Sequence, residues 1–243
     1  MKIALAQVKS ISGDIDFNIN HHEKFIAHAI GNKADLIIFP ELSITNYEPA
    51  LAQGMAFKND DLSLNSFQSL SDNNNITIVI GAPTKTDKGI HISLIFFRPN
   101  QSKLIYSKKY LHADEDPFFV PGANFPVLLI NDIKIAPAIC YELSVPDHAA
   151  TAHEHHATVY LASVSKTESG MEKAIERLKE ISTLYKMPAL ICNSVGASDN
   201  FVARGKSTVI ESGNLTSQLP ADKEGLIIYD TKSGDAKQLT MEK

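Results

Sequence analysis

Short apolar runs alternate with helical patterns along the whole chain. Most of the runs are rich in Val, Ile and Phe and are bounded by Gly, Pro, Asn or Asp, which is the pattern of strands. The runs at 35–39 and 77–80 are continuous rather than alternating, which indicates strands covered on both faces in a sheet buried between layers. Strands are predicted at Lys2–Val8, Asp35–Pro40, Ile76–Ala82, Ile92–Arg98, Leu104–Ser107, Val127–Ile130, Ile133–Ile139, Thr158–Ser163, Ala189–Ser194, Ser207–Glu211 and Leu226–Tyr229.

Amphipathic patterns between these runs predict the helices. At Asn18–Asn32 and again at Met171–Lys186, apolar side chains recur at helical spacing on one face. Less regular patterns at 65–75 and 146–156 predict two further helices. Because no internal repeat, low-complexity tract or linker interrupts the alternation, we expect a single layered α/β domain over residues 1–243.

The composition is that of an ordinary globular protein. The 243 residues are 44% hydrophobic and 21% charged, and a chain of this length buries enough surface to fold without a disulfide or metal staple. Lys and Arg number 23 against 28 Asp and Glu, so the net charge is −5, and there is no basic tract. An electrostatic nucleic-acid surface is therefore not expected.

The sequence also carries expectations about location. The apolar runs are shorter than the ~18 residues that a membrane helix needs. The apolar start of the chain is broken at Gln7 and Lys9, too soon for a signal peptide. Two cysteines without an export signal indicate free thiols in a reducing compartment. We expect a cytoplasmic protein with no membrane partner.

Three apolar runs end in a side chain that could carry chemistry. In the first, Pro40 stops a predicted strand and Glu41 follows at the carboxyl edge, where open α/β sheets form clefts. A carboxylate in apolar surroundings has a raised pKa and can act as a base. A solvated loop glutamate fits the same local sequence, so Glu41 alone does not decide between the two interpretations.

The second and third runs end in a lysine and a cysteine. A lysine such as Lys108 or Lys109 at a strand end usually guards a solvated edge, but a buried ammonium can stabilise an oxyanion. Cys140 lies between a strand and a predicted helix, where a turn exposes a nucleophile beside unpaired backbone amides. A thiol packed in the core fits that position as well.

Together and in this order, the three segments resemble the carbon-nitrogen hydrolase (nitrilase) superfamily, whose members use a Glu-Lys-Cys triad. The register selects Lys108 over Lys109 and places Glu115 on a second glutamate that many members carry. The resemblance covers residues 2–230. The matching residues are Ala34–Glu41 with Tyr47, Tyr106–Lys108 with Leu111, Glu115 and Phe119–Gly122, Cys140–Asp147, Asn193–Gly196, Gly205–Ser207 and Gly213.

The resemblance implies a four-layer α-β-β-α sandwich and assembly into homodimers or larger homo-oligomers. It implies that Cys140 is the nucleophile, Glu41 the general base, Lys108 an oxyanion donor and Glu115 a supporting carboxylate. No metal or organic cofactor is implied. The expected reaction is hydrolysis of a small linear amide, of the ω-amide or N-carbamoyl type, with release of ammonia or an amine.

Two positions depart from the family's pattern. Ser144 stands where many relatives have a basic residue that could bind a substrate carboxylate, which disfavours acidic amides. Tyr141 follows the nucleophile where nitrilases proper usually have Trp, and the chain has no Trp, which favours amides over nitriles. A nitrilase and a non-catalytic binding or scaffold protein remain the alternatives, although retention of all four triad and supporting residues argues against the scaffold.

Further side chains are candidates for the substrate pocket. Tyr141 and Glu142 could instead support the site from behind, and loop polarity explains the serines and Lys166 at the end of the next strand equally well. The candidate substrate-binding residues are Tyr47, Tyr141, Glu142, Ser163 and Ser165.

Two other features are given structural interpretations. The stretch from His148 to His156 holds four histidines, and His-rich tracts can bind metal. Their spacing makes no clean pair on one helix face, so we expect a solvated or interfacial helix and no metal site. Cys192 follows an apolar run and is expected to be a buried core thiol.

Overall fold

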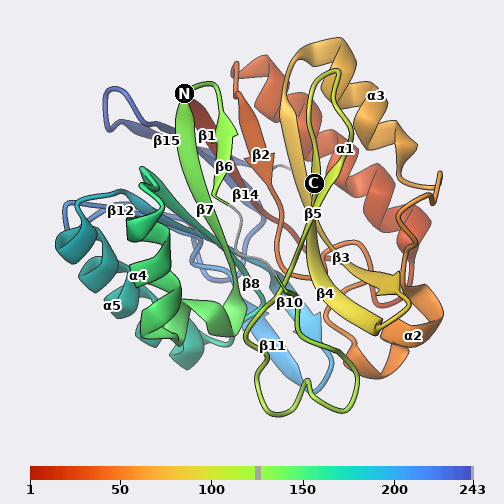
Figure 1. The fold of residues 1–243 in the computed structure, drawn as a ribbon. Coiled ribbons are helices and arrows are strands. Elements are labelled where there is room, and N and C mark those ends of the chain that lie inside the picture. Colours follow the sequence, from red (N-terminus) through yellow and green to blue (C-terminus); the bar gives the residue numbers. More distant parts are fainter. Residues whose placement is uncertain (124–126, 242–243) are drawn as a thin grey trace.

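Two β-sheets pack face to face at the centre of the molecule, and helices cover the outer face of each sheet (Figure 1). The structure is a computed structural model, and it describes residues 1–123 and 127–241. The helices are α1 Ile15–Gly31, α2 Ala52–Met55, α3 Asn65–Asn74, α4 Pro146–Glu154 and α5 Glu168–Tyr185, with 3-10 turns at Pro49–Leu51 and Cys140–Ser144.

The larger sheet has the strand order β15-β14-β1-β2-β3-β4-β5. The strands β1, β2 and β3 are parallel to one another, and the other neighbours are antiparallel. The bounds are β1 Lys2–Gln7, β2 Leu36–Ile38, β3 Thr77–Thr86, β4 Gly89–Phe97, β5 Leu104–Ser107, β14 Gly225–Asp230 and β15 Ala236–Thr240.

The second sheet has the order β13-β12-β9-β8-β7-β6, with β7, β8 and β9 parallel. A separate hairpin joins β10 to β11. The bounds are β6 Leu128–Ile130, β7 Ile133–Ile139, β8 Val159–Val164, β9 Ala189–Asn193, β10 Val195–Ser198, β11 Phe201–Arg204, β12 Thr208–Glu211 and β13 Asn214–Gln218.

Alternation of side chains across each strand divides the apolar core into three layers. In β1, Ile3 and Leu5 point between the sheets, whereas Ala4 and Ala6 pack under the helices. Phe25 of α1 and side chains of α3 complete that helix layer, and α4 and α5 build the third layer on the second sheet. Because the central strands are covered on both faces, they read as continuous apolar runs in the sequence. The layers stack as α-β-β-α, and the predicted fold is confirmed.

Local sequence signals set the helix boundaries. Asp14 caps α1 by accepting a hydrogen bond from the backbone N–H of Phe17, and the Thr167 hydroxyl caps α5 in the same way. Pro146 occupies the first turn of α4, where its missing N–H costs nothing. These caps place the helix starts at Ile15 and Glu168, three residues before the apolar patterns at Asn18 and Met171 that predicted them.

The predicted strands are all present, with shifts of a few residues at their ends. The strands that the sequence did not indicate are β10, β11, β13 and β15. These strands are short, and β13 and β15 lie at sheet edges with mostly polar, exposed side chains. Across residues 1–123 and 127–241, no helix combines the length and apolarity needed to cross a bilayer.

The helix layer over the larger sheet yields a stability prediction. Phe25→Ala removes a side chain that is 0% exposed and should lower the free energy of unfolding by about 3–5 kcal/mol. Phe17→Ala, on the same helix but 43% exposed, is the matched control and should cost under about 1 kcal/mol. Urea denaturation measures both. Equal losses in the two variants would contradict the assignment of this helix face to the core.

Candidate active site

Three segments that follow strand ends meet in one buried cluster. Glu41 comes after β2, Lys108 comes directly after β5, and Cys140 comes directly after β7. The Lys108 Nζ atom lies 2.8 Å from Glu41 Oε1 and 2.6 Å from Glu115 Oε1. All three charged side chains are 0–2% exposed. An ammonium between two carboxylates is therefore held away from water, where ion-pair interactions are strong.

A glycine makes room for the turn that carries Glu41. A Cβ atom at Gly81 of β3 would lie 2.2 Å from the Pro40 carbonyl oxygen and 2.5 Å from the Leu42 nitrogen. The backbone of β3 and the turn thus touch directly, and the Ile44 N–H donates to the Gly81 carbonyl at 3.1 Å. This close approach fixes the Glu41 backbone without help from loop side chains.

A second glycine supports the Lys108 segment. The Gly122 N–H donates to the Lys108 carbonyl oxygen at 2.7 Å, and the Lys108 N–H donates to the Ile92 carbonyl at 2.8 Å. A Cβ atom at Gly122 would lie 2.1 Å from the Ser107 carbonyl oxygen. The backbone around Lys108 is therefore held on both sides. Its neighbour Lys109 instead places its ammonium over the Tyr110 ring, 5.1 Å from the centroid.

Cys140 occupies a strained turn. Its φ is +45°, in the left-handed region that a side chain disfavours, and it begins the 3-10 turn Cys140–Ser144. Such strain costs on the order of 1–3 kcal/mol and persists only where the surroundings impose it. The first N–H groups of the turn have no partner inside it, so the backbone N–H of Tyr141 is available to an anion.

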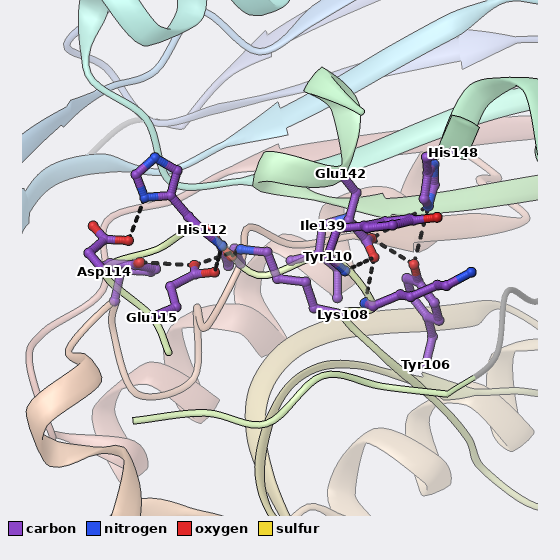
Figure 2. Close-up of polar contacts among 12 residues, drawn as sticks. Tyr106, Lys108, Tyr110, His112, Asp114, Glu115, Ile139, Glu142 and His148 are labelled. Atoms are coloured by element: carbon purple, nitrogen blue, oxygen red, sulfur yellow. Dashed lines mark hydrogen bonds and ion pairs between the residues drawn. The ribbon is translucent and has the colours of Figure 1, made fainter. Parts of the chain in front are cut away.

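The carboxylate of Glu142 imposes this turn (Figure 2). It accepts hydrogen bonds from the Ile139 N–H at 2.8 Å and from the Lys109 N–H at 2.6 Å, so one side chain ties the Cys140 turn to the lysine segment. The Tyr106 hydroxyl donates to it at 2.6 Å. Burial raises the pKa of Glu142, and these donors oppose that shift.

Glu142 continues into a buried network. His148 Nε2 lies 3.2 Å from the Tyr106 hydroxyl, and the Tyr160 hydroxyl lies 2.8 Å from His148 Nδ1. Burial lowers the pKa of His148 to about 3, so its ring is neutral. The expectation of a solvated stretch is wrong for His148, which is 1% exposed, because its ring completes this network. His153, His155 and His156 are exposed.

Both carboxylate oxygens of Glu115 accept hydrogen bonds (Figure 2). Its Oε1 accepts from Lys108 and from the Tyr47 hydroxyl at 3.0 Å, and its Oε2 accepts from the His112 N–H at 2.8 Å. Burial and the negative charge of Glu41 raise the pKa of Tyr47, so its hydroxyl stays protonated and donates. Glu115 therefore orients Lys108 and has little capacity left to act as a base.

Glu41 is arranged differently and suits proton transfer. Its Oε1 accepts from Lys108, whereas its buried Oε2 has no hydrogen-bond partner in the described part of the chain. Burial raises the pKa of Glu41 against the opposing charge of Lys108. Burial would lower the pKa of Lys108, but Glu41, Cys140 and Glu115 outweigh it, so the pKa is raised and the ammonium persists.

The thiol of Cys140 is protonated at neutral pH. Burial, and after it the charge of Glu41, raise the pKa of Cys140 to about 11, while Lys166 and Lys108 act in the opposite direction. A thiol is a weak nucleophile and needs a base to take its proton. Glu41 interacts with this thiol electrostatically, and its Oε2 has no hydrogen-bond partner among the described residues, so this oxygen could accept a proton.

Cys140 lines a cavity of about 390 Å³ beside this cluster. The size fits a small organic molecule, because ligand pockets start at roughly 300 Å³. A separate cavity of about 530 Å³ near β5 contains neither Cys140 nor the carboxylates. The lining residues of the Cys140 cavity are Tyr47, His112, Asp114, Glu115, Cys140, Tyr141, Ser165, Lys166, Thr167, Gly170, Asp199, Asn200 and Phe201.

The candidate pocket residues divide into two groups. Tyr47, Tyr141 and Ser165 line the cavity. Ser163 is buried and donates to the Phe39 carbonyl at 2.8 Å, and Glu142 lies in the network behind the turn, so the structure does not support a direct substrate contact for either.

Sequence reasoning missed much of the cavity rim. Asp199, Asn200 and Phe201 lie in and after the turn between β10 and β11, which carried no strand signal. His112 and Asp114 precede Glu115, and their side chains are hydrogen-bonded, with His112 Nδ1 2.6 Å from Asp114 Oδ1. The sequence signal that could have identified this loop was its position between Lys108 and Glu115.

Cys192 is buried as predicted, with its thiol 3.2 Å from the Ala6 carbonyl oxygen. Within the described ranges, no group of three or more His, Cys, Asp or Glu side chains is arranged to hold a metal ion.

A sequence model of the carbon-nitrogen hydrolase family matches residues 2–240. The chain belongs to the carbon-nitrogen hydrolase family. The carbon-nitrogen hydrolase fold explains why the three segments converge, and the resemblance seen in the sequence is confirmed. The curated relatives in this family include an (R)-stereoselective amidase of a Pseudomonas species, which is 23% identical to this chain.

The curated relatives of this carbon-nitrogen hydrolase differ in activity and length. A glutamine-dependent NAD(+) synthetase of Acinetobacter baylyi is 29% identical over 93% of this chain, but the chain spans only 43% of that relative. A probable nitrilase of Schizosaccharomyces pombe is 24% identical, with 98% of this chain and 90% of the relative covered. An omega-amidase of Escherichia coli is 24% identical, with 86% and 81% covered.

Among solved structures, an amidase from Nesterenkonia sp. AN1 has the same fold. The TM-score is 0.85 at 21% sequence identity, and the match covers 95% of this chain and 92% of that chain.

The contact between β3 and the Glu41 turn can be tested by stability. Gly81→Ala should lower the free energy of unfolding by about 1–3 kcal/mol, because its Cβ overlaps backbone atoms that cannot swing away. Gly31→Ala is the control, because a Cβ there meets nothing within 4 Å and alanine favours the helix. Urea denaturation measures both. A stable Gly81→Ala variant would refute the close approach.

The electrostatics of Cys140 predict a pH dependence. Its alkylation by iodoacetamide should rise roughly tenfold per pH unit below its pKa of about 11, because the thiolate reacts. Glu41→Gln should move this titration to lower pH by removing a negative charge, and Lys108→Met should move it to higher pH. Mass spectrometry of digests measures the rates, with buried Cys192 as the internal control. A midpoint near that of an ordinary thiol would contradict the assignment.

Proposed function

We propose that the protein is an amidohydrolase that cleaves a small linear amide, of the ω-amide or N-carbamoyl type, through an acyl thioester on Cys140. The observation that carries the proposal is the buried Glu41–Lys108–Glu115 cluster beside a cavity that Cys140 lines. One cluster holds a base, a cation and a thiol, which are the groups that acyl transfer requires.

In the first half of the reaction, Glu41 takes the proton from the Cys140 thiol. The thiolate attacks the amide carbon, and the carbonyl oxygen becomes an oxyanion. Glu41 then returns the proton to the nitrogen as the carbon–nitrogen bond breaks. Ammonia or an amine leaves, and the acyl group remains on sulfur as a thioester.

In the second half, a water molecule takes the place of the departed amine. Glu41 removes a proton from this water, and the hydroxide attacks the thioester carbon. When the carbon–sulfur bond breaks, the sulfur recovers a proton from Glu41 and the carboxylic acid product is free to leave. The raised pKa of Glu41 suits a group that both accepts and returns a proton near neutral pH.

Lys108 and the Tyr141 backbone N–H are the proposed donors to the oxyanion. An ammonium has three N–H groups, and Lys108 directs two of them to Glu41 and Glu115. The third is left for the substrate. One such donor is worth about 3 kcal/mol in the transition state.

The alternative activities differ in what they release. A nitrilase would convert a nitrile to a carboxylate and ammonia at the same cysteine, and a relative is named a probable nitrilase. A scaffold protein would release nothing. The retained base, lysine and thiol support the amidase over the scaffold.

The proposal also concerns the whole molecule. We take residues 1–243 as one carbon-nitrogen hydrolase domain that forms a homodimer or larger homo-oligomer in the cytoplasm. The family resemblance supports the assembly, and two free thiols suit a reducing compartment.

Ammonia release from a panel of amides, carbamoyl amines and nitriles tests the proposed function. Cys140→Ala should lower turnover at least ~1,000-fold, because the nucleophile is lost. Cys192→Ser keeps a donor to the same backbone carbonyls and should retain activity. Intact mass should show an acyl adduct on the native protein and none on Cys140→Ala. Turnover that persists in Cys140→Ala, or release from nitriles alone, would overturn the amidase assignment.

A further inference from the structure

Lys166 lines the Cys140 cavity, but the proposed acyl transfer gives it no role. It lies two residues beyond the end of β8, at the carboxyl edge of the second sheet. Among the described residues it is the only lysine or arginine in the lining of this cavity. A cation at this place faces whatever molecule occupies the space beside the nucleophile.

The backbone of Lys166 is held without involving its side chain. Its N–H donates to Asn193 Oδ1 at 2.8 Å, and its carbonyl oxygen accepts from Asn193 Nδ2 and from the Arg204 N–H, both at 3.1 Å. Asn193 is 0% exposed and also donates to the Gly205 carbonyl at 2.7 Å. This buried amide anchors Lys166 at a fixed point of the cavity wall.

The ammonium of Lys166 has no hydrogen bond or ion pair within residues 1–123 and 127–241. Lys206, a lysine near the same helix, is paired with Glu168 at 2.8 Å. The stem of Lys166 is half-buried against α5, where a Cβ at Gly170 would lie 3.3 Å from Lys166 Cβ. The charge of Lys166 lowers the pKa of Glu41 and of Cys140, but no described group forms a hydrogen bond or ion pair with the ammonium, so an anionic ligand can bind there.

The surroundings of Lys166 also favour an anion. Thr167 and Gly170, in the first turn of the 18-residue helix α5, line the cavity beside it. The positive end of the helix dipole adds to the lysine charge. Of the three acids in the lining, Glu115 is paired with Lys108, Asp114 is hydrogen-bonded to His112, and Asp199 lies at the exposed turn of the β10–β11 hairpin. None of the three forms an ion pair with Lys166.

We propose that Lys166 binds a carboxylate at the far end of the substrate, so that the enzyme acts on monoamides of short dicarboxylic acids. The inference rests on the proposed amidase function and specifies its substrate. The amide carbon would lie at Cys140, and the carboxylate at Lys166 and the start of α5. A cavity of about 390 Å³ limits such a molecule to a short carbon chain.

This assignment replaces an expectation from the sequence. Ser144, where relatives carry a basic residue, is exposed and does not line the cavity. Its lack of charge therefore does not disfavour an acidic amide. The positive charge comes instead from Lys166, two residues after β8.

Lys166 also influences the thiol, and this effect must be separated from substrate binding. Its charge lowers the pKa of Cys140. An ammonium that acted only on the thiolate would accelerate the hydrolysis of every amide to the same extent. An ammonium that binds a carboxylate discriminates between an anionic amide and a neutral amide of the same length. The ratio of kcat/KM for the two substrates is thus the informative quantity.

The test compares succinamate with butyramide, which replaces the carboxylate by a methyl group. In Lys166→Met the kcat/KM ratio of succinamate to butyramide should fall about 10- to 100-fold, mostly through KM, because a charge-assisted hydrogen bond is lost. Lys166→Arg should restore most of the ratio. Lys173→Met, an exposed lysine on α5 outside the cavity, is the control and should keep the native ratio.

A binding measurement keeps the proposal testable without turnover. Calorimetry should show succinate binding to Cys140→Ala at least about 10-fold more tightly than to the Cys140→Ala, Lys166→Met double variant. Equal affinities, an equal fall for both amides in Lys166→Met, or a native preference for butyramide would overturn the role of Lys166 alone. A native protein that releases ammonia from neither amide nor any other panel member would instead refute the proposed function.

Discussion

The contact on which the site depends is the burial of one ammonium between two carboxylates. Lys108 is shielded from water, so its ion pairs with Glu41 and Glu115 must offset the free energy lost when its charge is removed from solvent. The two acids differ in how their oxygens are hydrogen-bonded. Both oxygens of Glu115 accept hydrogen bonds, whereas Glu41 Oε2 has no hydrogen-bond partner among the described residues. This asymmetry separates a residue that positions from a residue that can move a proton.

The fold makes that contact possible because it ends three strands near the same place. Each sheet contains parallel strands. The residues that follow β2 and β5 of the larger sheet and β7 of the second sheet lie close together. Glu142 then ties the segments after β5 and β7 together through backbone N–H groups. A side chain beside Cys140 thereby sets the geometry without lining the cavity, which is the supporting role that the sequence left open as the alternative to substrate contact.

Buried elements of the structure were easier to predict from the sequence than exposed ones. Strands covered on both faces, such as β2 and β3, were evident from their continuous apolar runs. The edge strands β13 and β15 carry too few buried side chains to leave a pattern. The order of the sequence motifs identified Glu41, Lys108 and Cys140 as candidate site residues, whereas the residues of the cavity wall were harder to infer. Asp199 and Phe201 reach the cavity through a hairpin that only tertiary contacts define. Lys166 is distinguished by an ammonium without a hydrogen bond or ion pair in the described part of the chain, which its sequence context does not indicate.

The glycines at 81 and 122 have a consequence for how such a protein can change. At these two glycines one backbone segment touches another, so no side chain there can be replaced by a slightly larger or smaller one. The positions of Glu41 and Lys108 therefore cannot be adjusted gradually by substitution. The hairpin and the loop before Glu115 have no such restriction. We therefore expect substitutions that change substrate choice to be tolerated at the rim and not in the backbone that holds the reactive groups.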